Sequence, residues 1–238
     1  MAPPPSITKG LEMRVEIKYT PQSLNDVVYP NNTTELRVKA YGAGELEGHV
    51  MLYGPNGTGK TTIGKLLISA IGGQEPSVET KTWEELMALK NLRTYLLNAG
   101  VIASMSNSKK HFLLLNEFDK VKKGVSDLWT ALDACEDKVM AIITTNNPMD
   151  IDRSVRSRFD LIDVPAVKPS AVLRRVQYIL ETEGLNLPNE QVLFYLTQVG
   201  YFGDLRKYFK KADELLFLHR NGMEFPAWTA TPKTLKVV

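Results

Sequence analysis

The sequence predicts an α/β fold, in which a parallel β-sheet lies between helices and is followed by a small helical domain. Short apolar segments alternate with stretches of helical periodicity, as expected for parallel strands that are buried on both faces. A glycine-rich loop joins the first of these segments to a helix, and beyond residue 167 the patterns are helical. The apolar segments are residues 49–53, 111–115, 139–143 and 161–164. We expect the sheet domain at residues 11–166 and the helical domain at residues 168–220.

Composition and charge indicate an intracellular globular protein. Of the 238 residues, 43% are apolar, which is ample for a core, and the formal net charge of +2 is too small to indicate nucleic-acid binding by itself. The single cysteine, Cys135, cannot form an internal disulfide, which favours a reducing compartment. No apolar stretch approaches the length of a membrane span, and residues 1–5 do not form a signal peptide. We therefore expect a cytoplasmic protein without a membrane partner.

The N-terminal part carries weak patterns. Residues 1–10 are rich in proline, and we expect a disordered arm there. Ile17 to Pro21 has the character of a strand followed by a turn, and Thr33 to Tyr41 has that of a short helix. These segments become informative only through their position ahead of the glycine-rich loop.

Residues 54–61 match the phosphate-loop pattern G-x-x-x-x-G-K-[ST]. The apolar strand 49–53 precedes them, and a helix with apolar residues at helical spacing from Ile63 to Ile71 follows. Glycines let backbone N–H groups surround an anion, and the helix N-terminus adds a partial positive charge. Lys60 is expected to reach the β- and γ-phosphates, and the Thr61 hydroxyl to hold Mg²⁺. A glycine turn without a ligand is the alternative, but strand and helix both stand where the motif needs them. The expected phosphate-binding residues are Gly54, Pro55, Asn56, Gly57, Thr58, Gly59, Lys60, Thr61 and Thr62.

The middle of the chain continues the alternation of strands and helices. Gly72 and Gly73 end the loop helix, and residues 78–80 are expected to form a short strand. Thr82 and Glu85 fit a capping box, which opens a helical stretch that continues intermittently to about residue 98. After the buried strand 111–115, a further helix is expected at residues 125–134.

Polar residues follow the buried strand 111–115 directly. Nucleotide hydrolases with this loop place an Asp-Glu pair at such a strand end, where the first acid supports Mg²⁺ and the second polarises the attacking water. Here the pair is Asn116 and Glu117, so Glu117 is the expected base. The Asn116 amide can accept a hydrogen bond from a metal-bound water but brings no negative charge, which predicts slow hydrolysis unless a neighbour such as Asp119 supplies the charge. The alternative is that two polar residues merely cap the strand.

A second group of polar residues follows strand 139–143. Asn146 is a candidate for orienting the attacking water or sensing the γ-phosphate. Arg153, Arg156 and Arg158 come next; such a cluster is usually a solvated surface, but in a nucleotide hydrolase it can instead supply an arginine finger to the nucleotide of a neighbouring subunit. The alternative for Arg158 is an ion pair within its own chain, for example with Asp160 or Asp163.

The helical domain is expected to contain three helices. Apolar residues at helical spacing mark residues 172–180, residues 191–199 and a third helix that begins at Gly203-Asp204. Arg206 lies off the apolar stripe of the third helix and near its start. A positive charge is disfavoured at a helix N-terminus, so this position favours a phosphate partner. Residues 221–238 are expected to form an irregular C-terminal tail.

Taken together, these stretches resemble the AAA+ ATPases, and within them the small ATPase subunits of DNA polymerase clamp loaders, including the phage type. The resemblance spans about residues 14–219. It implies a five-stranded sheet, with Mg²⁺-ATP bound at the seam between the two domains. It also implies that Asn146 acts as sensor 1, Arg158 as the arginine finger and Arg206 as sensor 2. The implied adenine contacts are Tyr19, Pro21, Val27 and Val28. The stretches that carry the resemblance are residues 18–21, 54–61, 114–119, 144–147, 157–159 and 203–206.

The chain departs from this pattern at three points. Asn116 replaces the usual aspartate, and Phe159 stands where clamp-loader subunits commonly carry a cysteine. The third difference concerns the helical domain, which corresponds to the lid of these ATPases. Roughly 20 residues follow its third helix, whereas clamp-loader subunits continue there into a helical collar. The resemblance therefore predicts either a relative without a collar or a shortened chain.

The resemblance implies a ring or spiral of several subunits, assembled through Arg158. The first functional hypothesis is a DNA-dependent ATPase that loads a sliding clamp or remodels a DNA-bound complex. The second is an ATP-gated scaffold with weak hydrolysis, as Asn116 would allow, and the third is an ATP-driven protein remodeller. Candidate contacts to the DNA backbone are Lys109, Lys110, Lys122 and Lys123, although such runs also occur as solvated surface.

Overall fold

The computed structural model describes residues 14–105, 108, 110–118, 125–135 and 137–228. The expected arm at residues 1–10, the residues after 228 and four residues named above therefore lie outside the described part. Those four are Lys109, Asp119, Lys122 and Lys123. None of the helices in the described part is long and apolar enough to cross a membrane.

The sheet has five strands in the order β2-β3-β4-β1-β5, and every neighbouring pair is parallel. The predicted parallel α/β fold is confirmed. The strand that composition shows least clearly is β2, which forms one edge, and alternate residues of it are exposed. The strands are β1 (His49–Tyr53), β2 (Ser77–Lys81), β3 (His111–Leu115), β4 (Val139–Thr145) and β5 (Phe159–Asp163).

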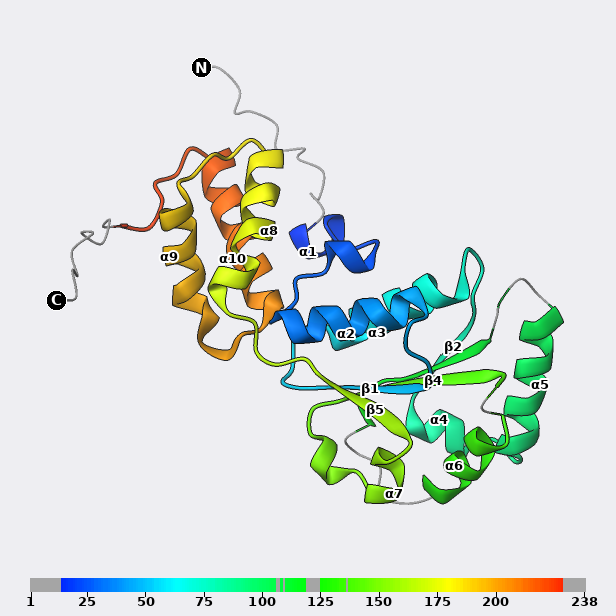
Figure 1. The fold of residues 1–238 in the computed structure, drawn as a ribbon. Coiled ribbons are helices and arrows are strands. Elements are labelled where there is room, and N and C mark those ends of the chain that lie inside the picture. The colour runs from blue at the N-terminus through cyan, green and yellow to red at the C-terminus, as the bar shows by residue number, and fades with distance from the viewer. Residues whose placement is uncertain (1–13, 106–107, 109, 119–124, 136, 229–238) are drawn as a thin grey trace, which may run out of the picture.

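Helices cover both faces of the sheet (Figure 1). Alternate residues of β3 point to opposite faces: Phe112 and Leu114 enter one core, Leu113 and Leu115 the other. Both faces are buried, which is why the central strands are continuously apolar. One face carries α2 (Asn32–Ala43) and α3 (Lys60–Gly72). The other carries α4 (Trp83–Met87), α5 (Leu92–Met105), α6 (Val125–Asp133) and α7 (Arg153–Arg156).

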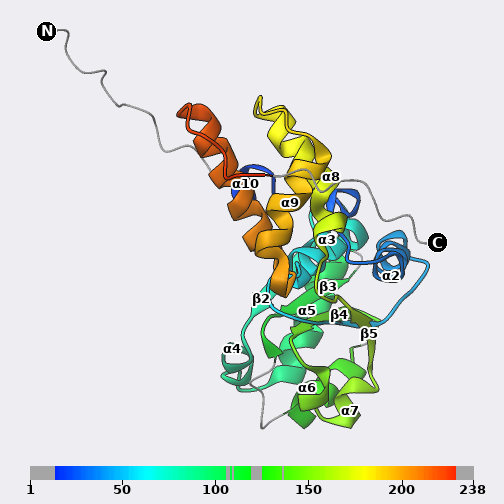
Figure 2. The ribbon, with the colours of Figure 1, turned by 90° about the vertical axis from the view of Figure 1, so that its left-hand side faces the viewer.

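The C-terminal helices form a third core of their own. Figure 2 shows these helices rising above the sheet domain. Their buried residues include Val176, Tyr195 and Tyr208, one from each helix. Short 3₁₀ turns, Pro148–Asp150 and Gly200–Phe202, precede α7 and α10. The helices are α8 (Pro169–Thr182), α9 (Asn189–Val199) and α10 (Leu205–Arg220).

The N-terminal segment corrects one expectation. Ile17 and Lys18, expected at the start of a strand-like stretch that runs to Pro21, instead end the short helix α1 (Val15–Lys18), and a 3₁₀ turn follows at Leu24–Asp26. Val15 is buried in the core of α8–α10, and its N–H donates to Asp213 Oδ1 at 2.9 Å. The helix forms because contacts from a distant part of the chain stabilise it, and a local pattern does not record such contacts.

Candidate active site

A cleft of about 250 Å³ lies where the carboxyl ends of β1, β3 and β4 meet the helical domain. Its walls come from the N-terminal segment, the loop before α3 and the start of that helix, the ends of β3 and β4, the middle of α8 and the start of α10. Most of the residues named as site candidates line it: Tyr19, Pro21, Val27, Val28, Asn56, Gly57, Thr58, Gly59, Lys60, Thr61, Thr62, Glu117, Asn146 and Arg206. The polar ends of parallel strands meet at one edge of the sheet, which is why segments so far apart in sequence converge.

The loop between β1 and α3 has the backbone that its glycines permit. Gly54 has φ 143°, and a Cβ atom there would lie 2.2 Å from the carbonyl oxygen of Val164. Gly57 has φ 77°, and a Cβ there would lie 2.0 Å from the Asp204 carboxylate. Neither conformation nor space suits a larger residue, so the loop can approach both its neighbours and a ligand closely.

The Lys60 side chain is nearly buried inside this loop. Its Nζ donates to the carbonyl oxygens of Gly54 and Pro55, both at 2.7 Å, and to Asn146 Oδ1 at 3.1 Å. The ammonium charge is therefore fixed between the loop and the end of β4. A positive charge held beside backbone N–H groups at a helix start suits a polyphosphate.

Hydroxyl groups connect the ends of β3 and β4 through Asn116. Asn116 Oδ1 accepts from Thr61 Oγ1 at 3.1 Å and from Thr144 Oγ1 at 3.3 Å. The two residues proposed to support Mg²⁺, Thr61 and Asn116, therefore lie in contact. Among the described residues no group of three or more His, Cys, Asp or Glu side chains could hold a metal. Neutral oxygen donors suit Mg²⁺ when substrate phosphates and water complete its shell, so these residues fit the ion.

Glu117 has an unusual backbone conformation. Of the described residues other than glycine, it alone has a positive φ, 54°. Its N–H donates to Thr144 Oγ1 at 3.2 Å, and the next residue, Phe118, is buried against Trp83 and Trp129. Such a conformation persists only where the surroundings enforce it, and it is often found at functional sites. Thr144, to which the sequence analysis gave no role in the site, thus contacts both residues of the Asn116-Glu117 pair.

The start of α10 contacts the phosphate loop. Leu205 N–H donates to Gly57 O at 2.9 Å, and the Asp204 carboxylate caps the helix by accepting from the N–H of Arg206 at 2.9 Å. Arg206 is exposed and lines the cleft. The helical domain therefore brings a positive charge to the same cleft as Lys60.

The opposite end of the cleft is walled by the N-terminal segment. The Tyr19 ring packs edge-on against Tyr178, and its hydroxyl donates to Glu183 Oε1 at 2.5 Å. Burial and the Glu183 carboxylate raise the pKa of Tyr19 to about 12, so its hydroxyl stays protonated and donates. Arg175 also lines the cleft, and its Nη2 donates to Tyr19 O at 2.9 Å. The sequence analysis did not predict Arg175 as a site residue. The signal that pointed to Arg206, a position off the apolar stripe of its helix, is also present at Arg175 on α8.

Arg158 is missing from the described residues that line the cleft. It is exposed, and its Nε and Nη2 donate to the two carboxylate oxygens of Asp133 at 2.9 Å and 3.0 Å. The ion pair considered as an alternative does exist, but its partner is Asp133, on α6, and neither Asp160 nor Asp163. Arg158 therefore lies on the surface of the chain, outside its own cleft.

Comparison with known proteins finds a family match in the sheet-forming part of the chain. Residues 50–164 match the model of the ATPase family associated with various cellular activities (AAA). Replication factor C small subunit 2 of Pyrobaculum islandicum is 24% identical over 196 residues, with 80% of this chain and 59% of the relative covered. The replication factor C small subunit of Methanosarcina barkeri is 26% identical over 212 residues, with 86% and 61% covered. The chain thus spans about three fifths of the length of these curated relatives.

Solved structures resemble the fold. The RuvB Holliday junction branch migration motor of Thermotoga maritima superposes with a TM-score of 0.65 at 16% identity, covering 86% of this chain and 68% of RuvB. The replication initiator DnaA, bound to AMPPCP and single-stranded DNA, gives a TM-score of 0.60 at 17% identity, with the same coverage. The family match includes the phosphate loop, Glu117 and Asn146. Residues 50–164 therefore match the AAA ATPase family, and over most of its length the chain is similar to the small subunits of replication factor C.

Proposed function

We propose that this AAA+ ATPase binds Mg²⁺-ATP in the cleft and acts in DNA replication as a clamp-loader-like, DNA-dependent subunit of an oligomer. The convergence of Lys60, Glu117, Asn146 and Arg206 on one cleft carries the ATPase part of the proposal. The similarity to replication factor C small subunits supports the replication part.

In this proposal each residue acts on a defined part of the triphosphate. The loop N–H groups and Lys60 bind the phosphate oxygens, and Thr61 and Asn116 hold Mg²⁺, which would neutralise charge on the β- and γ-phosphates. Glu117 accepts a proton from water as that oxygen attacks the γ-phosphorus and the bond to the β-phosphate oxygen breaks. Asn146 orients the water.

Two arginines complete the proposed site. Arg206 stabilises the charge that develops on the phosphates from its own subunit, and Arg158 does so from a neighbouring subunit. Because Arg158 lies outside the cleft of its own chain, full activity would depend on assembly.

A second candidate function is an ATP-gated scaffold that assembles and hydrolyses little. The observation in its favour is Asn116, whose neutral amide takes the place of a carboxylate beside Thr61. Without that charge the metal is held less firmly, and the in-line geometry that Glu117 serves is set less well.

One experiment separates the candidate functions: steady-state ATP hydrolysis measured with and without primer–template DNA, and with a candidate sliding clamp. The replication proposal expects hydrolysis that rises with DNA and clamp. ATP-dependent assembly with little hydrolysis would favour the scaffold, and hydrolysis indifferent to DNA would favour a protein remodeller. Lys60→Ala is the control, because it removes the charge fixed in the loop. Unchanged ATP affinity of this variant by calorimetry would overturn the phosphate-loop assignment.

A further inference from the structure

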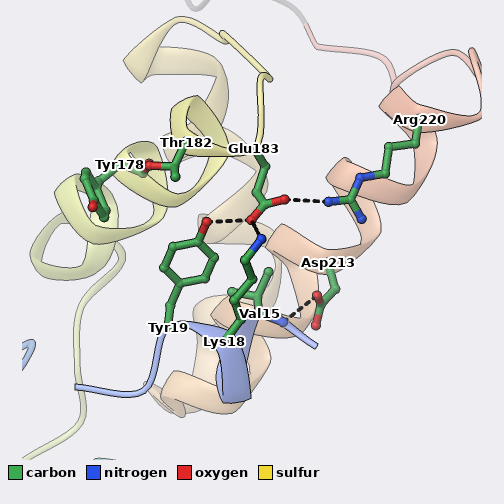
Figure 3. A network of polar contacts seen from close by, with 8 residues as sticks. All are labelled: Val15, Lys18, Tyr19, Tyr178, Thr182, Glu183, Asp213 and Arg220. Atoms are coloured by element: carbon green, nitrogen blue, oxygen red, sulfur yellow. Dashed lines mark hydrogen bonds and ion pairs between the residues drawn. The ribbon is translucent and has the colours of Figure 1, made fainter. Parts of the chain in front are cut away.

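Glu183, at the C-terminal end of α8, binds the N-terminal segment to the helical domain (Figure 3). Its side chain is only 9% exposed, yet three groups donate to it. Oε1 accepts from Lys18 Nζ at 2.6 Å and from Tyr19 OH at 2.5 Å, and Oε2 accepts from Arg220 Nη2 at 2.7 Å. The hydrogen bonds from Lys18 and Tyr19 lower the pKa of Glu183, so the carboxylate is charged.

The other polar contacts of this segment lead to the same helices. Asp213 on α10 accepts the backbone N–H of Val15, and Arg175 on α8 donates to the carbonyl oxygen of Tyr19. The Val15 side chain is buried in the core of the helical domain. Although 156 residues separate Tyr19 from Arg175 and 198 separate Val15 from Asp213, α1 and the helical domain therefore form one packed unit.

Tyr19 is the point at which this unit meets the cleft. Its ring is held edge-on against Tyr178, at 6.5 Å between ring centroids, and its hydroxyl is held by Glu183. Pro21, two residues on, also lines the cleft. The Glu183 carboxylate thus fixes the orientation of the Tyr19 side of the cleft, although Glu183 does not itself line the cleft.

We propose that Glu183 is a positioning residue for base recognition, which acts by holding Tyr19 and the segment after it against the base of the bound nucleotide. The proposal rests on the proposed ATP site. It divides the cleft into two parts: the phosphate loop, carried by the sheet domain, and the base wall, carried by the helical domain.

This division makes the test specific. Glu183→Gln keeps the size of the side chain but removes the charge that neutralises Lys18 and Arg220, and Tyr19→Phe removes only the hydroxyl that Glu183 holds. Either variant weakens or removes the hydrogen bond between Tyr19 and Glu183 and should raise the Kd for ATP about tenfold, which corresponds to about 1.4 kcal/mol. Inorganic tripolyphosphate, which has no base, should bind each variant as it binds the unchanged protein. The preference for ATP over GTP should fall with the ATP affinity.

The measurement is competition of ATP, GTP and tripolyphosphate against a fluorescent ATP analogue on the full chain, with far-UV circular dichroism as the fold check. Glu214→Gln is the matched control, because it makes the same change of side chain in the same domain at a carboxylate that forms an ion pair with Lys211 within α10. Equal losses for ATP and tripolyphosphate, or no loss for ATP, would overturn the role of Glu183. If Glu183→Gln does not fold, Tyr19→Phe decides by the same criteria. Failure of the unchanged protein to bind either ligand would instead contradict the proposed function.

Discussion

In the proposed site, the charge at position 116 is what distinguishes the two candidate functions. Its amide oxygen already accepts from Thr61 and Thr144, and an aspartate oxygen could accept the same bonds. The added charge would lie beside Mg²⁺, where it strengthens metal positioning.

We expect Asn116→Asp to raise kcat for ATP hydrolysis about tenfold, a modest share of the several kcal/mol that a well-placed metal contributes. Glu117→Gln should lower kcat by roughly a hundredfold or more, because it removes the base. Both variants should keep the ATP affinity measured by calorimetry. If Asn116→Asp gained nothing, Asn116 would not be a brake on hydrolysis.

His49 makes stability depend on pH. It is 9% exposed in β1, and its Nδ1 accepts from the N–H of Ala141. Burial, with a smaller effect of Lys110, lowers its pKa to about 4 from an ordinary 6.5. Between these values the unfolded chain binds a proton that the folded chain does not, so stability falls as the pH falls.

We expect this histidine alone to reduce the free energy of unfolding by about 2 kcal/mol between pH 7.5 and pH 5. Urea unfolding at the two pH values measures the change. His111, whose pKa burial also lowers, adds to it in the same direction, so the test is the difference between the unchanged protein and His49→Gln. If the free energy of unfolding changed equally between the two pH values in both proteins, His49 would not titrate in this way.

At the scale of elements, the join between the sheet domain and α10 depends on Gly203. Gly203 has φ 62° and accepts the N–H of Val167, and a Cβ atom there would lie 2.6–2.8 Å from atoms of Ala166 and Val167. Gly222 has the same φ of 62°, but nothing lies within 4 Å of its Cβ position. Comparing substitutions at these two glycines therefore distinguishes the cost of backbone strain from the cost of steric crowding.

We expect Gly222→Ala to cost about 1 kcal/mol, from the positive φ alone, and Gly203→Ala to cost about 1–3 kcal/mol more, from overpacking. Denaturant unfolding of the two variants measures the difference. Equal losses would mean that the Ala166–Val167 backbone yields to the added methyl group.

Elements differ in how far their own residues specify them. The central strands were predicted because both of their faces are buried, which leaves a continuous apolar run such as 139–143. In contrast, the four residues of α1 are too few to show periodicity, and the helix depends on Asp213 and on the core of α8–α10. The edge strand β2 has one exposed side, so its pattern is weaker.

The same reasoning applies to the candidate site. A motif with fixed spacing, such as residues 54–61, carries its chemistry in consecutive positions, so the sequence alone points to it. Arg175 and Thr144 enter the cleft because of how whole elements pack, and Asp133 meets Arg158 because α6 lies beside α7. Such contacts depend on strand order, which came from the family resemblance and not from the pattern of residues.

At the scale of the whole molecule, Arg158 tests whether the working form is an oligomer. Arg158→Ala removes both the guanidinium and its ion pair, whereas Asp133→Asn breaks the same ion pair and leaves the arginine in place. An exposed ion pair contributes little to stability, so both variants should unfold like the unchanged protein.

We expect Arg158→Ala to lower kcat about a thousandfold, the smaller end of what an arginine finger supplies, and to leave ATP binding nearly intact. Asp133→Asn should retain turnover. Specific activity of the unchanged protein should rise with protein concentration, as measured by steady-state hydrolysis across a dilution series. If both variants behaved alike, or activity ignored concentration, Arg158 would serve only its own chain.

Because α1 docks on the helical domain, it cannot reach its final position during synthesis until that domain has been made. Val15 and its partner Asp213 are 198 residues apart. At 5–20 residues per second, a ribosome needs roughly 10–40 s to make the chain between them. Throughout that time α1 is an isolated turn of helix, too short to persist by itself. Although α1 is made before the helices on which it docks, it can reach its place only after them, and the side of the cleft formed by Tyr19 is completed only when α10 has been made.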